Sequence, residues 1–146
     1  MAKFNAELPN DLMKAFEDLE TNAPQMMGEM CQAGAEVVYK KVVANLGKAF
    51  AKTDTLLKGL KITKVYNTPS DDGINVHIGF YGYDAESKPT KRHPKGTPIP
   101  LIAMAREYGT SSGESAKPFF RKSFKKKDIE SAMLEVQKKY IKDDGR

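Results

Sequence analysis

The chain has 146 residues, of which 40% are hydrophobic and 29% charged, and its formal net charge is +5. This length suits one domain with a single buried core, residues 1–146, and the composition is typical of a globular protein rather than a disordered one. No apolar run approaches the roughly 18 to 20 residues that cross a bilayer, and the N-terminus lacks the basic-then-apolar layout of an export signal. We therefore expect no membrane association.

The charge is distributed unevenly along the chain. Residues 1–57 hold six Lys against eight Asp and Glu, a net charge of −2, so residues 58–146 carry +7. Such an asymmetry favours head-to-tail contact between copies or attraction to nucleic acid, although a solvated lysine-rich surface has the same composition.

Two helices are expected in the first 50 residues. The spacing of Leu12, Phe16 and Leu19 predicts a short amphipathic helix over about 9–21, and Pro24 then interrupts the pattern. A longer second helix should follow, with one broad stripe facing the core. The members of this stripe are Met27, Cys31, Gly34, Val38, Val42, Leu46 and Phe50.

The hydrophobic period changes from about 3.6 to 2 in the next part of the chain. Apolar and polar residues alternate over 60–66 and again over 74–81, and the segment Asn67–Gly73 has the Pro and Asp-Gly chemistry of a chain reversal. An antiparallel hairpin over about 60–82 is therefore predicted, with an apolar face against the helices. The opposite, polar face should carry Lys61, Thr63, Asn75, His77 and Tyr81.

Residues 83–98, YDAESKPTKRHPKGTP, hold three Pro and five basic side chains, counting His93, and little that could be buried. We expect an exposed, mobile loop here. Long irregular loops in compact domains are frequently contact elements, and a tolerated insertion is the alternative. The candidate contact residues of this loop are Lys88, Lys91, Arg92 and Lys95.

A short helix is predicted over about 99–108, with Leu101, Ile102, Met104 and Ala105 packed inward. Gly109 lies where a helix commonly ends in the left-handed conformation, and Pro118 suits the first turn of a last helix. The residues that should anchor and line this last helix are Phe119, Phe120, Phe124, Ile129, Met133, Val136 and Tyr140. Together the elements predict an α+β fold, with N-terminal helices and a C-terminal helix packed on a small antiparallel sheet.

The sequence contains no catalytic constellation, so we expect no enzyme activity and no cofactor. His93 lies in a Pro- and Lys-rich loop and His77 on a polar strand face, so neither is placed to serve a nucleophile. Cys31 is the sole cysteine, which excludes an internal disulfide, and with two His it forms no zinc-ligand spacing. We expect no metal. Glu107 is expected to be an ion-paired or interfacial carboxylate.

Two motifs near the C-terminus carry a resemblance to a known family. Glu107–Thr110 reads Glu-Tyr-Gly-Thr, and Pro118–Arg121 reads Pro-Phe-Phe-Arg. This pair resembles the signatures of the small neck, or tail-completion, proteins of long-tailed phages and prophages, the gene-product-ten-like family. A weaker resemblance lies at Thr53–Leu56. The family tends to show Thr-Gly-x-Leu there, and in this chain Asp54 replaces the Gly. After Arg121 the family frequently has Pro-Ala, whereas this chain has Lys-Ser.

The resemblance implies a structural virion protein of the head-tail joining region, which completes the tail or docks it to the head as a ring subunit. It implies a homo-oligomer, with a hexameric ring as the first expectation, whose partners are the tail tube or terminator and the head connector, with DNA passing through the ring. The protein would be located in the virion after assembly in the host cytoplasm. The alternative is a nucleic-acid-binding protein without sequence specificity. Besides the four loop cations, the candidate interface residues are Glu107, Tyr108, Phe119 and Phe120.

Overall fold

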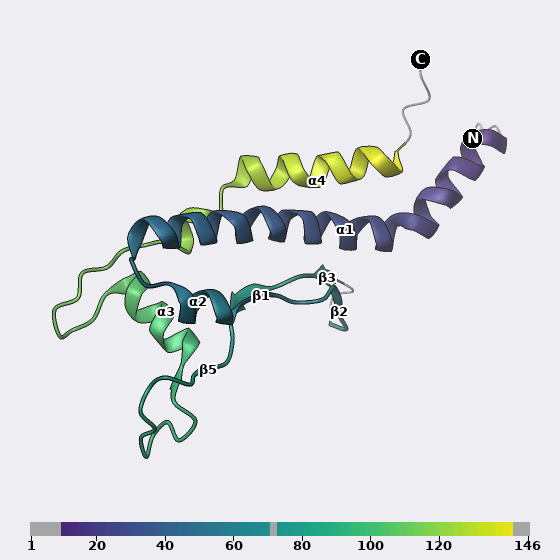
Figure 1. The fold of residues 1–146 in the computed structure, drawn as a ribbon. Helices are drawn as coiled ribbons and strands as arrows, with labels where there is room; N and C mark the ends of the chain where they lie inside the picture. Colours follow the sequence, from purple (N-terminus) through teal and green to yellow (C-terminus); the bar gives the residue numbers. More distant parts are fainter. Residues whose placement is uncertain (1–9, 71–72, 142–146) are drawn as a thin grey trace, which may run out of the picture.

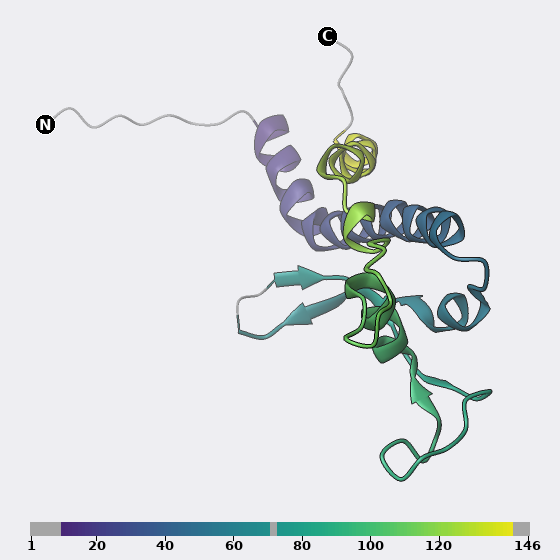
Figure 2. The ribbon, with the colours of Figure 1, turned by 90° about the vertical axis from the view of Figure 1, so that its left-hand side faces the viewer.

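The computed structural model describes residues 10–70 and 73–141 and has an α+β architecture, which confirms the predicted fold class. Helix α1 forms the middle layer, with α4 on one side and the hairpin strands, α2 and α3 on the other (Figures 1 and 2). The elements in chain order are α1 (Asn10–Ala49), α2 (Asp54–Gly59), β1 (Leu60–Ile62), β2 (Tyr66–Thr68), β3 (Gly73–Asn75), β4 (Ile78–Phe80), β5 (Tyr83–Asp84), β6 (Thr97–Pro98), α3 (Ile99–Tyr108), the 3-10 turn η1 (Arg121–Ser123) and α4 (Lys126–Tyr140).

The two N-terminal helices expected from the sequence are one continuous helix, α1, so that prediction was wrong. Pro24 lies inside α1. A proline within a helix removes one backbone hydrogen bond and its ring clashes with the carbonyl four residues earlier, which kinks a helix without always ending it. The N-terminal part of α1, purple in Figure 1, is accordingly inclined to the rest of the helix.

The core lies where the C-terminal half of α1 meets α2, β1 and α3. Phe119 is fully buried there, and its ring lies edge-on to Phe50 and Phe80, with 6.0 Å between centroids in each pair. The sequence stripe is confirmed in its second half, whereas Met27 at its start remains 48% exposed. The buried hydrophobic residues are Val38, Val42, Leu46, Leu56, Leu60, Ile99, Ala103 and Phe119.

Helix α4 packs along α1 on the face opposite the hairpin, and not on the sheet as expected (Figure 1). Gly34 allows this close approach, because a Cβ there would lie 3.1 Å from Cγ2 of Ile129 and 3.6 Å from Cγ of Met133. An ion pair between Lys41 and Asp128 links the same two helices. The inward stripe of the last helix is therefore confirmed, with α1 as its partner.

The predicted antiparallel hairpin is confirmed, but a change of register divides it into two ladders. Ile62 pairs with Ile78 between β1 and β4, whereas Tyr66 pairs with Asn75 between β2 and β3. Residues 63–65 therefore oppose only residues 76–77, which is a β-bulge. Two residues of the predicted reversal, 71 and 72, lie outside the described residues.

The bulge corrects the predicted position of Tyr66. A slip of one residue moves every following side chain to the other face of a strand. Tyr66, expected on the apolar face, instead lies beside His77, with its hydroxyl 2.5 Å from Nε2 of the imidazole.

Residues 83–98 form a projection that we call the basic arm, at the bottom of Figures 1 and 2. The predicted exposure is confirmed, but the base of the arm has structure that the sequence did not predict. β5 pairs with β6, and Ser87 Oγ donates to the carbonyl of Asp84 (2.8 Å) and accepts from the N–H of Thr97 (2.6 Å). The arm thus leaves the body as a hydrogen-bonded stem.

We predict that Phe119→Ala lowers the free energy of unfolding by about 3–5 kcal/mol, because it leaves a cavity in the core. The matched control is Phe16→Ala, since Phe16 is 53% exposed and the change is chemically identical. The control should shift stability by less than about 0.5 kcal/mol. Urea denaturation followed by circular dichroism measures both, and equal effects of the two variants would contradict this account of the core.

Candidate functional site

The two sequence motifs meet at one buried carboxylate, which belongs to Glu107 at the end of α3. Glu107 is only 4% exposed. Its Oε2 accepts hydrogen bonds from the backbone N–H of Phe119 (2.8 Å) and Phe120 (3.0 Å). Its Oε1 accepts from the N–H (3.2 Å) and Nε (2.9 Å) of Arg121. We call Glu107 with residues 119–121 the Glu107 junction.

These contacts determine the protonation state of the carboxylate. Burial by itself raises the pKa of Glu107, but hydrogen bonds from the N–H groups of Phe120 and Phe119 and from Arg121 outweigh burial. The pKa therefore lies below its ordinary value of 4.5, and Glu107 is an anion at neutral pH. The predicted ion pair is confirmed, with Arg121 as the partner.

The junction also explains why the last helix begins at Lys126 and not at Pro118, as the sequence had suggested. The first backbone N–H groups after Pro118 donate to Glu107, and the chain reaches α4 through the turn η1. Ser123 in this turn is fully buried, donates to the carbonyl of Phe119 (2.7 Å) and accepts from Asn45 of α1 (3.0 Å). The segment is thus fastened to both α3 and α1.

Gly109 directs the chain from α3 into the loop between the two motifs. Its φ of 79° and ψ of 177° are an extended backbone with positive φ, which is accessible essentially to glycine, and not the left-handed helical conformation expected. A Cβ at this position would lie 2.7 Å from the carbonyl oxygen of Glu114 and 2.9 Å from the nitrogen of Ala116. Both the backbone and the packing therefore require glycine.

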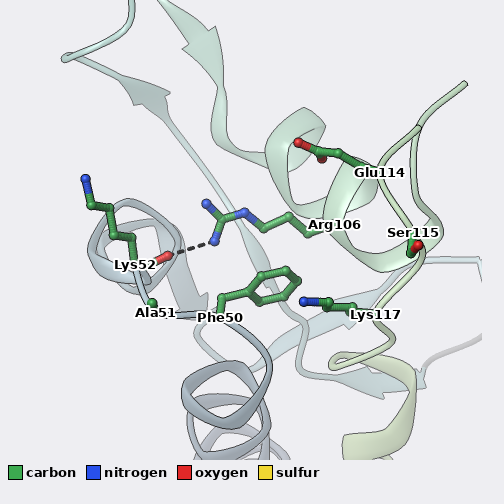
Figure 3. A pocket seen from close by; sticks show the side chains of 7 residues that line it. All are labelled: Phe50, Ala51, Lys52, Arg106, Glu114, Ser115 and Lys117. Carbon is green, nitrogen blue, oxygen red and sulfur yellow. Dashed lines mark hydrogen bonds between the residues drawn. The ribbon is translucent and has the colours of Figure 1, made fainter. Parts of the chain in front are cut away.

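On one side of the junction the loop covers a hollow of about 500 Å³ at the end of α1 (Figure 3). The guanidinium of Arg106 lies 4.8 Å from the centroid of the Phe50 ring, and the ammonium of Lys117 lies 5.6 Å from it. Arg106 also donates to the carbonyl of Lys52 (2.8 Å). Arg106 thus holds α3, and Lys117 holds the loop, against the aromatic ring that ends the core stripe.

On the other side lies an open, mainly apolar hollow of about 280 Å³, which we call the apolar hollow. Met104 and Tyr108 at its edge are each 58% exposed, and the guanidinium of Arg121 lies 4.7 Å from the centroid of the Tyr108 ring. A ligand or partner side chain would meet aromatic and aliphatic groups here, with one cation at the rim. The apolar residues that line it include Ile78, Phe80, Pro100, Ala103, Met104, Tyr108 and Phe120.

The structure separates the predicted interface residues into three groups. Glu107 and Phe119 are buried, so the expectation that they contact a partner directly is corrected. Tyr108 is exposed and Phe120 half-buried at the apolar hollow. The remaining four are exposed on the basic arm: Lys88, Lys91, Arg92 and Lys95.

Sequence reasoning missed the exposure of one face of α3. Leu101 and Met104 were expected to pack inward, but they are 48% and 58% exposed, whereas the inward positions are Ile99, Ala103 and Glu107. The spacing of four residues was present in the sequence. The pattern was overlooked because its third position is Glu107, a charged residue that is not expected to be buried.

Over residues 10–70 and 73–141, no helix is long and apolar enough to cross a bilayer, and no group of three or more His, Cys, Asp and Glu could hold a metal ion. Cys31 is half-buried, with its sulfur 3.7 Å from the carbonyl oxygen of Ile74.

No protein-family model, no curated protein and no solved structure matches this chain. The resemblance to the neck proteins of phages therefore rests on the sequence motifs.

We predict that Glu107→Gln lowers the free energy of unfolding by about 3 kcal/mol at pH 7, because a neutral amide replaces a buried, paired charge that accepts four hydrogen bonds. The lowered pKa means that the native carboxylate contributes stability above pH 4.5 and loses it as the pH falls through the native pKa. The difference between the two proteins should therefore shrink under acid. The control is Glu114→Gln, because Glu114 is exposed. Denaturation at several pH values measures the free energy of unfolding of each protein. If the difference between Glu107→Gln and the wild type does not change with pH, the stabilising role of the Glu107 carboxylate is contradicted.

Gly109→Ala and Gly113→Ala form a second matched pair. Both glycines have positive φ, 79° and 112°, but a Cβ at Gly113 would meet no atom within 4 Å. We expect about 1–2 kcal/mol of destabilisation at Gly113 from the backbone alone and a larger loss at Gly109, where the methyl group also collides with backbone. Thermal denaturation of the two variants tests this order, which the opposite ranking would refute.

Proposed function

We propose that this protein is a structural subunit of the head-tail joining region of a phage or phage-derived particle, which forms a ring and performs no catalytic turnover. The proposal rests on the resemblance in two separate motifs, Glu107–Thr110 and Pro118–Arg121.

The observation that supports it best is that these motifs form one physical unit. The first motif supplies the buried carboxylate and the glycine turn, and the second supplies the three N–H groups and the guanidinium that the carboxylate binds. The Pro-Phe-Phe-Arg segment also delivers Phe119 to the core, so the pair of motifs is required for this fold.

The shape of the chain supports an architectural role. The basic arm and the N-terminal part of α1 both extend away from the layered body (Figures 1 and 2). Extended elements of this kind contact neighbouring subunits in rings, in which one patch meets a different patch until the rotation closes. In the proposed particle the neighbours are copies of this chain, the tail tube or terminator and the head connector.

The second candidate function is nucleic-acid binding without sequence specificity, and the basic arm is the observation that favours it. Four exposed cations lie on the arm, and the ammonium of Lys95 lies 5.9 Å from the centroid of the Tyr83 ring at the base of the arm. Such a surface would contact phosphates, with an affinity that falls steeply with salt. A ring through which DNA passes would have the same positively charged surface without binding the DNA tightly.

The proposed function predicts a closed oligomer of one defined mass, a hexamer first, for the protein alone or together with head and tail proteins encoded beside its gene. Native mass spectrometry and negative-stain microscopy measure this. The proposal fails if the protein remains monomeric with all of these partners, or if its gene lies in a locus without virion genes.

The same proposal predicts little retardation of random duplex DNA at about 150 mM salt, and the same weak retardation after reversal of the charges on the basic arm. The variant for this test changes Lys88, Lys91, Arg92 and Lys95 to Glu. The control variant reverses four other exposed lysines: Lys40, Lys48, Lys138 and Lys139. Tight DNA binding that only the arm variant loses would favour the second candidate.

A further inference from the structure

The N-terminal part of α1, residues 10–24, is an amphipathic helix with no core of its own. Leu12, Met13, Phe16 and Leu19 remain between 37% and 53% exposed. The same segment carries four carboxylates and one Lys, a net charge of −3. We call it the acidic arm of α1.

A helix of this length gains little stability in water unless its apolar face is covered. Clustered apolar side chains on a soluble protein mark a contact surface. The end of α4 covers only the base of the acidic arm, where Leu19 and Met26 line a further hollow with Tyr140. Leu12 and Phe16 lie beyond it and are open to a partner.

The same chain has a second uncovered apolar surface, the apolar hollow with Met104 and Tyr108 at its edge. Its charge is complementary to that of the acidic arm. Arg121 lines the hollow and its side chain is 56% exposed, so a cation stands beside the apolar surface and can meet the carboxylates of the arm. The volume of about 280 Å³ can accept one large aromatic side chain such as Phe16.

The two surfaces of one chain cannot meet each other. Phe16 lies 30 residues before the core residue Leu46 in the same helix, which is about 45 Å of helix axis at about 1.5 Å per residue. Phe119, packed in the core with Leu46, lines the floor of the hollow. The middle of α1 therefore acts as a spacer that keeps the arm and the hollow apart.

We propose that the acidic arm of one copy docks on the apolar hollow of a second copy, with Phe16 inserted beside Met104 and Tyr108. The inference rests on the proposed function and specifies the contact between neighbouring subunits of the ring. The contact is heterologous, so each copy gives its arm to one neighbour and its hollow to the other, and the chain of contacts closes when the rotation allows.

Disulfide cross-linking tests the pairing directly. Cys31→Ser gives a cysteine-free background, because Cys31 is the sole cysteine. In that background, Leu12→Cys is made in one sample and Met104→Cys in a second sample of different mass. Oxidation of the mixture should give a cross-linked heterodimer as the main product, whereas cross-linking within either sample alone, above all between two Leu12→Cys chains, would overturn the proposed pairing.

Complementation gives a second test that does not depend on cysteine chemistry. Phe16→Asp removes the arm contact and Met104→Asp removes the hollow contact, and both positions are exposed, so both variants should fold with the far-UV circular dichroism of the wild type. Each variant alone should be monomeric in sedimentation analysis. An equimolar mixture should form a dimer and nothing larger, because one functional patch remains on each partner. Glu36→Lys, at an exposed position of α1 outside the arm, is the control and should assemble like the wild type.

The outcomes separate this inference from the proposed function. If both Asp variants form the same closed ring as the wild type, the arm-to-hollow contact is refuted while the ring remains. If the arm and hollow pair as described but the product is an open filament, the inference holds and the ring proposal fails. The inference is overturned if the two cysteine variants do not cross-link and the wild-type protein does not self-associate at about 1 mM.

Discussion

The architecture depends on the buried carboxylate of Glu107. This single group accepts four hydrogen bonds from three consecutive residues, 119–121, and so joins the end of α3 to the start of the segment that leads into α4. A buried charge is tolerable only when it is fully paired, and here every donor comes from the segment that the charge holds. The same bonds place Phe119 among the side chains of α1, α2, β1 and α3, so the core and the junction form together.

The hydrophobic periodicity of the sequence correctly predicted features that depend on neighbouring residues alone. The antiparallel hairpin and the buried positions Val38, Val42 and Leu46 follow from spacing in the sequence, and the end of α3 follows from Gly109. The error at the start of the last helix occurred where a distant contact outweighs local preference. Pro118 suits a helix start, but the N–H groups that follow it bind Glu107 instead. Pro24 suits a helix boundary, but the helix continues through it.

The candidate site was predictable only in part, for a related reason. Composition identified the basic arm, because a segment with so little to bury must be exposed. An amphipathic pattern, however, has the same form whether its apolar face meets the core or another molecule. Phe16 and Val42 both lie on helical stripes, yet Phe16 is 53% exposed and Val42 is fully buried. Only the three-dimensional arrangement separates packing residues from contact residues.

The distribution of charge and apolar surface suggests how an assembly of such subunits would behave. In the proposed contact, Arg121 and the carboxylates of the acidic arm would lie at the rim, where charges mainly accelerate association and salt screens them. Phe16, Met104 and Tyr108 lie at its centre, where burial of apolar area governs the lifetime of the complex. Salt should therefore slow the formation of the contact much more than it shortens the life of a contact already formed. A subunit of this kind would associate through long-range electrostatic attraction and dissociate slowly because of short-range apolar packing. Slow dissociation suits a subunit of a permanent assembly.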